Sequence, residues 1–174
     1  MKRIAIPLLA VVLARAAFAA DAKPVTTVIL VRHGEKVTDP AVKDPALTAA
    51  GEARAKELAR VLTGVKIDAI YVTPFNRTRQ TAAPLAEAAS LKAIEIAAGA
   101  DYPAAMAKTI RTGHAGQTIV VVGHSNTTPD VIRALGIADP PAIPDSEYDD
   151  IFVVTLADGS APRLLALRYG AVAR

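Results

Sequence analysis

The chain has 174 residues, a formal net charge of +3, no cysteine, and hydrophobic side chains at 52% of its positions. This length fits one domain with a sizeable core, and the lack of cysteine excludes a disulfide framework or a thiolate metal site. Three of the 20 basic residues fall within the first 19 positions, which hold no acid, so the remainder carries 17 basic against 17 acidic residues. Because no basic cluster occurs in that remainder, we expect no nucleic-acid binding.

The first 19 residues have the layout of a secretory signal peptide. A basic start precedes an apolar run over residues 4–14, and Ala17-Phe18-Ala19 forms a small-x-small cleavage site. The apolar run is too short to span a bilayer. We expect cleavage after Ala19 or Ala20, a catalytic domain over residues 20–174, and a periplasmic or secreted protein with no stable membrane insertion. Arg15 is unusual so near the cleavage site, which leaves open an uncleaved amphipathic tail.

Short β-branched runs alternate with longer Ala-rich amphipathic runs along the rest of the chain. The pattern predicts four strands and four helices; the strands cover residues 27–31, 67–72, 94–97 and 118–122, and the helices 48–62, 76–89, 103–112 and 129–135. Asn76 and Thr128 are the expected N-caps of the second and fourth helices. Two further apolar runs flank Ala157-Asp158-Gly159-Ser160, which predicts a hairpin. The fold class is therefore α/β, a three-layer α/β/α sandwich whose mostly parallel sheet ends in an antiparallel C-terminal hairpin.

Side chains suited to chemistry gather where three of the predicted strands end. The first strand leads into Arg32-His33-Gly34-Glu35, the second into residues 73–79, and the fourth into Gly123-His124-Ser125-Asn126. Ligands of such sheets bind outside the carboxyl ends of the parallel strands, so two of the three histidines should meet there with arginines. Guanidinium groups and helix N-termini bind phosphate well, and the crowded positive charges require an anion between them. We therefore predict a pocket for a phosphoryl group.

Two other segments look less informative. His114 lies in a loop before a strand, where we expect it to be solvated. Residues 136–150 are rich in proline and acids and are typical of one surface loop. Within that loop we expect the acidic run over residues 147–150 to be solvated as well.

The segment Gly123-His124-Ser125-Asn126-Thr127 comes within one residue of the G-x-S-x-G nucleophile elbow of serine hydrolases. An enzyme of that type needs an acid and then a histidine after the serine in chain order. No histidine follows His124 in this chain. We therefore assign the chemistry to His124 and not to Ser125.

Four motifs carry a resemblance to a known family: "LVRHGEK", "LTAAGEARAKELARVL", "IDAIYVTPFNRTRQTAAPLA" and "TIVVVGHSNT". In this order they resemble the histidine phosphatase superfamily, also called phosphoglycerate-mutase-like, in its short exported bacterial type. The resemblance implies that His33 is the nucleophile that becomes phosphorylated and that Arg32 and Arg77 clamp the phosphoryl oxygens. It implies that His124 is a second pocket histidine that donates to the transferring group. It implies no metal or other cofactor, and a small phosphorylated substrate as the partner.

The resemblance leaves the general acid open, because family members supply this carboxylate from varying places. Asp101, just after the third predicted strand, is our favoured residue, and Glu35 is its rival. We expect a metal-independent phosphomonoesterase that acts through a phosphohistidine intermediate on His33. Its substrate would be a small phosphorylated metabolite or an envelope saccharide. The alternative is a non-catalytic phosphate-ligand or partner-binding module that keeps the pocket without a competent acid.

Overall fold

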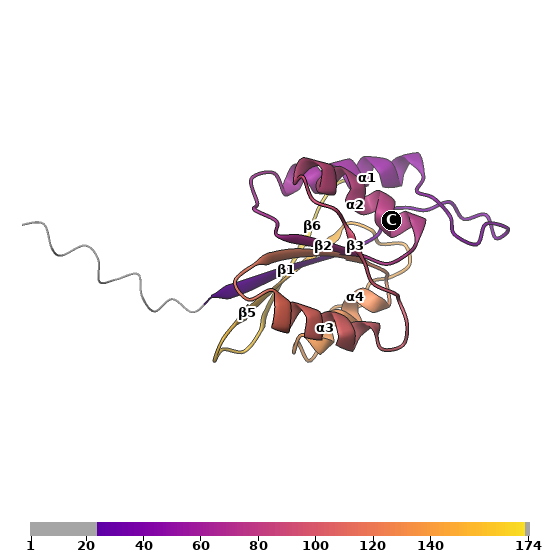
Figure 1. Cartoon of the computed structure of the whole chain (residues 1–174). Helices are drawn as coiled ribbons and strands as arrows, with labels where there is room; N and C mark the ends of the chain where they lie inside the picture. The colour runs from indigo at the N-terminus through magenta and orange to yellow at the C-terminus, as the bar shows by residue number, and fades with distance from the viewer. Residues whose placement is uncertain (1–23, 173–174) are drawn as a thin grey trace, which may run out of the picture.

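The computed structural model describes residues 24–172, which form one six-stranded sheet with helices on both faces (Figure 1). The strands are β1 (Val25–Arg32), β2 (Ala69–Val72), β3 (Ile94–Glu95), β4 (Thr118–Gly123), β5 (Asp150–Ala157) and β6 (Arg163–Arg168). The helices are α1 (Ala49–Val61), α2 (Asn76–Ala88), α3 (Tyr102–Gly113) and α4 (Thr127–Ala134). The predicted signal peptide lies outside the described residues.

The strands follow the order β3-β2-β4-β1-β5-β6 across the sheet. The pairs β1–β4, β2–β4 and β2–β3 are parallel, whereas β1–β5 and the β5–β6 hairpin are antiparallel. The predicted fold class, a mostly parallel sheet between helical layers with an antiparallel C-terminal hairpin, is therefore confirmed.

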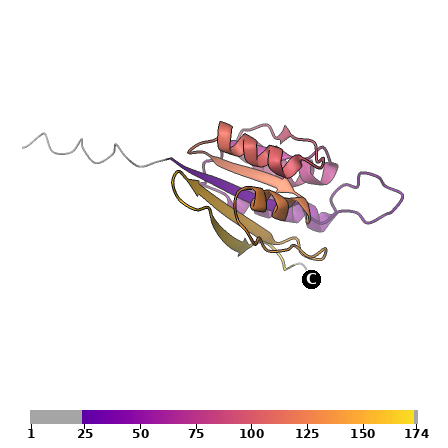
Figure 2. The same ribbon diagram turned by 90° about the horizontal axis from the view of Figure 1, so that it is seen from below.

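Alternate residues of the central strand β1 point into two separate hydrophobic cores. Val28 and Leu30 pack with the layer of α3 and α4, whereas Ile29 and Val31 pack with the layer of α1 and α2. Figures 1 and 2 show these two helix pairs on opposite faces of the sheet. Because both faces are covered, the strand reads as a continuous apolar run, as expected for a buried parallel strand.

The helix starts differ in part from the predicted caps. Thr48 caps α1, since its side chain accepts a hydrogen bond from the backbone N–H of Gly51 at 3.2 Å. Asn76 is the first residue of α2 and not its cap; the carboxylate of Asp44 accepts the Asn76 backbone N–H at 3.0 Å. Thr128 lies inside the first turn of α4, which begins at Thr127. At α2, a carboxylate from a distant loop thus replaces the local cap that the sequence predicts.

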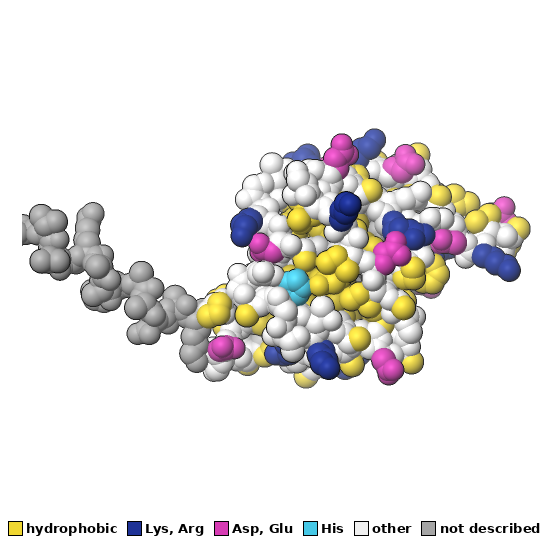
Figure 3. All heavy atoms as spheres, viewed as in Figure 1, with side chains coloured by type: hydrophobic (Ala, Val, Ile, Leu, Met, Phe, Trp, Pro, Cys, Tyr) yellow, Lys and Arg dark blue, Asp and Glu magenta, His cyan; other side chains and the backbone are white. Residues whose placement is uncertain are grey.

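No helix within residues 24–172 is long and apolar enough to cross a membrane. On the face seen in Figure 3, basic and acidic side chains are interspersed around an apolar area. The segment that follows β1 extends away from the body of the molecule, as Figures 1 and 2 both show. This segment leaves the sheet at the carboxyl end of β1, the edge at which the predicted pocket residues lie.

Two glycines bring the segment after β1 into direct contact with α1. A Cβ atom added to Gly51 would lie 2.2 Å from the backbone oxygen of Glu35, and one added to Gly34 would lie 2.9 Å from the Gly51 oxygen. Real Cβ atoms do not approach backbone this closely, so only glycine fits at either position. The close approach fixes the backbone that directly follows His33.

We predict that Gly51→Ala lowers the free energy of unfolding by about 3 kcal/mol, because the new methyl group must push the Glu35 backbone away. Gly113→Ala, at the end of α3, is the matched control, since its added Cβ would meet nothing within 4 Å. Urea unfolding of both variants checks this. Equal stability of the two variants would contradict the close packing described for Gly51.

Candidate functional site

The pairing of three adjacent strands brings the predicted pocket residues to one edge of the sheet. Arg32 of β1 lies opposite Gly123 of β4, and Val72 of β2 lies opposite Val122 of β4. His33, His124 and Thr73 therefore follow the strand ends side by side. The two imidazole rings stand edge to face, with their centroids 5.3 Å apart. The structure thus joins two histidines that are separated by more than half of the described chain.

His33 is neutral and presents one free nitrogen. Its Nδ1 lies 2.7 Å from the backbone oxygen of Gly34, which can only accept, so the ring proton sits on Nδ1. Its Nε2 makes no hydrogen bond and is not among the buried unpaired atoms, so it is open to solvent. Burial lowers the pKa of His33 to about 3; the Gly34 contact opposes this, and the charges of His124, Arg77 and Arg32 add to it. At neutral pH, Nε2 therefore carries an available lone pair.

His124 is neutral for a similar reason, since burial and the charges of Arg77 and Arg32 lower its pKa to about 4. Its Nε2 lies 3.0 Å from the hydroxyl of Thr73. Its backbone N–H donates to the Thr127 hydroxyl at 3.1 Å, and the ring of Phe75 packs edge to face against it. Thr73 and Phe75, in the turn between β2 and α2, therefore hold this ring in one orientation, and Thr127 of α4 holds the His124 backbone.

Arg32 is 5% exposed and is held by the loop that the sequence predicts to be an ordinary surface loop. One of its nitrogens, Nη1, donates to three backbone oxygens, those of Pro144, Asp145 and Glu147, at 2.8–2.9 Å. The ring of Tyr148 lies 4.0 Å from the guanidinium carbon. These contacts fix the plane of the guanidinium, and its Nε is left buried with no partner.

Arg77 repeats this arrangement from the start of α2. Its guanidinium carbon lies 4.4 Å from the centre of the Phe75 ring, and its Nε is also buried with no partner. The only carboxylate paired with it among the described residues is that of Asp44, at 3.8 Å. Burial is the main cause that lowers the pKa of Arg77, and the charge of Arg32 adds to it. Two buried donors without partners, beside two neutral imidazoles, form a site that favours an anion.

The two candidate acids lie in different surroundings. Both carboxylate oxygens of Glu35 accept from Nε of Arg54 at 3.0–3.1 Å, and Nη2 of Arg54 adds a bond of 2.7 Å. Burial opposes ionisation of Glu35, but the Arg54 hydrogen bonds and charge outweigh it and lower its pKa. Glu35 is thus held as a carboxylate and has no proton to donate. Asp101, in the loop before α3, is exposed and makes no side-chain hydrogen bond or salt bridge within residues 24–172.

Two sequence predictions about polar residues are wrong. His114 is not simply solvated, because its Nε2 lies 2.6 Å from the Tyr71 hydroxyl and its Nδ1 contacts the Gln117 side chain. The acidic run over residues 147–150 is not simply solvated either. Asp149 and Asp150 are 4% and 7% exposed, and both pair with Arg168 across the β5–β6 hairpin.

Sequence reasoning assigned no role to Thr73, Phe75 or Tyr148, which all contact the pocket residues. Thr73 lies four residues before Arg77 in the quoted stretch "IDAIYVTPFNRTRQTAAPLA", so its place in that motif was the available signal. Tyr148 had no such signal, because it reaches Arg32 from a loop more than 110 positions away in the chain. In the described residues, no group of three or more His, Asp or Glu side chains could hold a metal ion.

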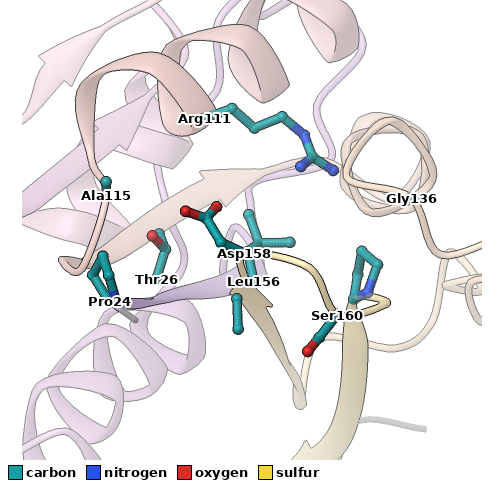
Figure 4. Close-up of a pocket in the computed structure, with 10 residues that line it drawn as sticks. Pro24, Thr26, Arg111, Ala115, Gly136, Leu156, Asp158 and Ser160 are labelled. Carbon is teal, nitrogen blue, oxygen red and sulfur yellow. The ribbon is translucent and has the colours of Figure 1, made fainter. Parts of the chain in front are cut away.

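A hollow of about 300 Å³ lies at the opposite edge of the sheet, where β1 begins and β5 ends. Figure 4 shows Arg111 and Asp158 reaching into it from two sides, above Thr26. One nitrogen of Arg111 already has a partner, since Nη2 donates to the backbone oxygen of Leu135 at 2.8 Å. The hollow holds none of the predicted site residues and is separate from the two histidines.

We predict that stability falls as the pH drops from 6.5, because the folded protein keeps His33 and His124 neutral while the unfolded chain protonates them. The unfolded state then binds more protons than the folded state. Each histidine therefore lowers the free energy of unfolding by up to about 1.4 kcal/mol for every pH unit between 6.5 and its lower pKa in the folded protein. Urea unfolding at several pH values measures this slope. His124→Gln should remove the contribution of one histidine from this slope. An unchanged slope would contradict a neutral His124.

Part of the chain is similar to proteins of a known family. Residues 28–99 match the sequence model of the histidine phosphatase superfamily (branch 1). Phosphoserine phosphatase 1 of Hydrogenobacter thermophilus is 40% identical over 72 residues, which cover 38% of this chain and 34% of that relative. The matched part of the chain thus spans about a third of the length of that curated relative.

Solved structures share the fold over most of the chain. The protein histidine phosphatase SixA, complexed with tungstate, is 22% identical with a TM-score of 0.65, covering 82% of this chain and 96% of SixA. Phosphoserine phosphatase from Entamoeba histolytica, in complex with 3-phosphoglyceric acid, is 18% identical with a TM-score of 0.62, covering 84% and 98%. The segment that matches the family model contains Arg32, His33 and Arg77, and the solved structures extend the likeness in fold over most of the chain. Residues 28–99 thus match the histidine phosphatase superfamily, and the chain shares the fold of solved members over most of its length.

Proposed function

We propose that the protein is a phosphatase of phosphoric monoesters that uses His33 as its nucleophile. The observation that carries this proposal is the state of the His33 ring. Its Nδ1 is occupied by the Gly34 oxygen, and its Nε2 is free beside two arginines whose buried Nε atoms have no partner. A neutral imidazole held in this way can attack phosphorus while the guanidinium groups receive the phosphoryl oxygens.

The reaction has two steps. In the first, Nε2 of His33 forms a bond to phosphorus while the bond from phosphorus to the ester oxygen breaks, and the departing oxygen takes a proton. In the second, a water oxygen attacks phosphorus and gives a proton back to the group that protonated the ester oxygen, the N–P bond breaks, and inorganic phosphate leaves with His33 neutral again. Arg32 and Arg77 offset the negative charge of the equatorial oxygens in both steps. No step requires a metal ion, and we propose a metal-independent reaction.

For the proton donor we retain Asp101. Glu35 is unsuited because Arg54 holds it as a carboxylate. Asp101 lies in the loop after β3. In the sheet only β2 separates β3 from β4, and this loop leaves the sheet at the same edge as the two histidines. Its side chain is free of other partners among residues 24–172, so it can turn toward a bound substrate.

We further propose a small phosphorylated metabolite or an envelope saccharide as the substrate, and export to the periplasm or beyond as the location. The relatives named above act, by their names, on phosphoserine or phosphohistidine, which supports a phosphoryl compound without choosing among the classes. The signal-peptide pattern of the first 19 residues supports export.

The second candidate is a phosphate-binding module that does not turn over. One observation favours it: Asp101 is exposed and nothing in the described structure orients it toward the pocket. The free Nε2 of His33 favours the enzyme, because binding alone needs a donor at that position and not a lone pair. Activity measurements separate the two candidates.

We predict that the protein hydrolyses p-nitrophenyl phosphate in the presence of a chelator, and that His33→Ala lowers kcat by about 10³-fold or more, because the nucleophile is lost. His114→Gln is the matched control, since His114 contacts Tyr71, away from the pocket. Tungstate binding by the His33→Ala variant shows that its pocket is still formed. No hydrolysis by the wild type over a wide pH range, with tungstate still bound, would instead favour the binding module.

The choice of acid gives a separate prediction. Asp101→Asn should slow the hydrolysis of alkyl phosphates by about 10²-fold or more but affect p-nitrophenyl phosphate little, because a good leaving group departs without a proton. Glu35→Gln should lower the free energy of unfolding by about 1–3 kcal/mol through the weakened Arg54 pair, with kcat changed much less on either substrate. Initial rates on both substrates measure this; the reverse pattern would assign the acid to Glu35.

A further inference from the structure

We propose that Thr73 sets the tautomer of His124, so that His124 can donate to a bound phosphoryl group only after it gains a second proton. Thr73 is then a positioning residue, because the tautomer that it sets requires His124 to take up a proton when an anion binds. The inference rests on the proposed function only in taking the ligand of the pocket to be a phosphoryl group or a similar dianion.

A chain of hydrogen bonds gives the Thr73 hydroxyl one direction. The hydroxyl of Thr78 lies 2.8 Å from the backbone oxygen of Thr73 and 2.9 Å from that of Phe75. Neither carbonyl oxygen can donate, so the single Thr78 proton points to them. The Thr73 hydroxyl, 3.0 Å from that of Thr78, must then be the donor between the two hydroxyls.

The direction of this chain decides which nitrogen of His124 carries the proton. The Thr73 hydroxyl has already given its own proton to Thr78, so it accepts from Nε2 of His124 at 3.0 Å. Thr73 and Thr78 are both fully buried, and no water from bulk solvent competes for these positions. Neutral His124 is therefore protonated on Nε2 and carries its lone pair on Nδ1.

The Nδ1 atom makes no hydrogen bond and is not among the buried unpaired atoms, so it is open to solvent. A lone pair at this position repels the oxygens of a dianion. When Nδ1 is protonated, the same ring donates to the ligand and to Thr73 at once. The ring geometry thus permits a favourable contact with a phosphoryl oxygen only in the doubly protonated state.

Without a bound anion, the charged groups around His124 disfavour a proton on its Nδ1. Arg32 and His33 face it from the end of β1, and Arg77 faces it from α2. Tyr148 reaches the His33 ring from the loop before β5, and Asp145 of that loop is 96% exposed. In α4, Asp130 and Arg133 pair with each other at the surface. A bound dianion offsets the two guanidinium charges, and the proton on Nδ1 then becomes favourable.

Nitrogen-15 NMR of the full chain with labelled histidines tests the inference directly, because the sequence holds only three. In the free protein at neutral pH we expect His124 protonated on Nε2 and His33 protonated on Nδ1. After addition of tungstate, which stays a dianion at mildly alkaline pH, we expect both nitrogens of His124 to be protonated. A His124 that is protonated on Nδ1 without ligand, or that stays neutral with tungstate bound, would overturn the proposal.

Two variants separate the role of the hydroxyl from mere packing. Thr73→Val keeps the shape but offers no acceptor, so the His124 proton should move to Nδ1 and tungstate binding should take up close to one proton fewer than in the wild type. Thr73→Ser restores the acceptor and should restore the Nε2 tautomer. Calorimetric titrations in buffers of different ionisation enthalpy count the protons, including any taken up by His33. Equal proton uptake in Thr73→Val and the wild type would also overturn the proposal.

These measurements do not depend on turnover. If the tautomer and proton uptake are as expected but no phosphatase activity is found, the proposed function fails and the inference stands. If activity is found and depends on His33 while the His124 tautomer is the opposite one, the inference fails and the proposed function stands.

Discussion

The parallel pairing of β1 with β4 is the constraint on which the rest of the site depends. It sets Arg32 opposite Gly123, so that the residues that follow, His33 and His124, leave the sheet as neighbours. The backbone continues this pairing for one more step, since the N–H of His33 donates to the Gly123 oxygen at 3.0 Å. A shift of the register by one residue would turn one histidine to the opposite face of the sheet and separate the two rings.

Burying two arginines and two histidines at one edge carries an electrostatic cost, and the structure offsets it in different ways for the two residue types. The histidines stay neutral, with pKa values lowered to about 3 and about 4. The arginines remain charged, and carbonyl oxygens and aromatic faces offset their charge. Arg32 is stabilised by three loop carbonyl oxygens and the Tyr148 ring. Arg77 is stabilised by the Phe75 ring. On each guanidinium the buried Nε is left without a hydrogen-bond partner. The remaining demand of the pocket is therefore for negative charge.

Behind the pocket, the pair formed by Glu35 and Arg54 ties three parts of the chain together. Arg54 binds Glu35 through two nitrogens and also donates to the backbone oxygens of Tyr169 and Ala171. The segment after His33, helix α1 and the end of the chain beyond β6 are thus held by one buried guanidinium. The carboxylate two positions from His33 thus has a structural role, because its partner keeps it ionised.

The order of strands and helices and the position of each reactive residue at a strand end follow from the sequence alone, because hydrophobic period and chain order are local properties. Arg32, His33, Arg77 and His124 could therefore be chosen from their motifs. Only the tertiary structure decided which groups orient them. Asp44 caps α2 from 32 positions away, and Pro144 binds Arg32 from 112 positions away, so neither contact leaves a local pattern. The same holds for the choice between Glu35 and Asp101: the sequence shows two acids near strand ends, and the buried Arg54 decides that one of them stays ionised.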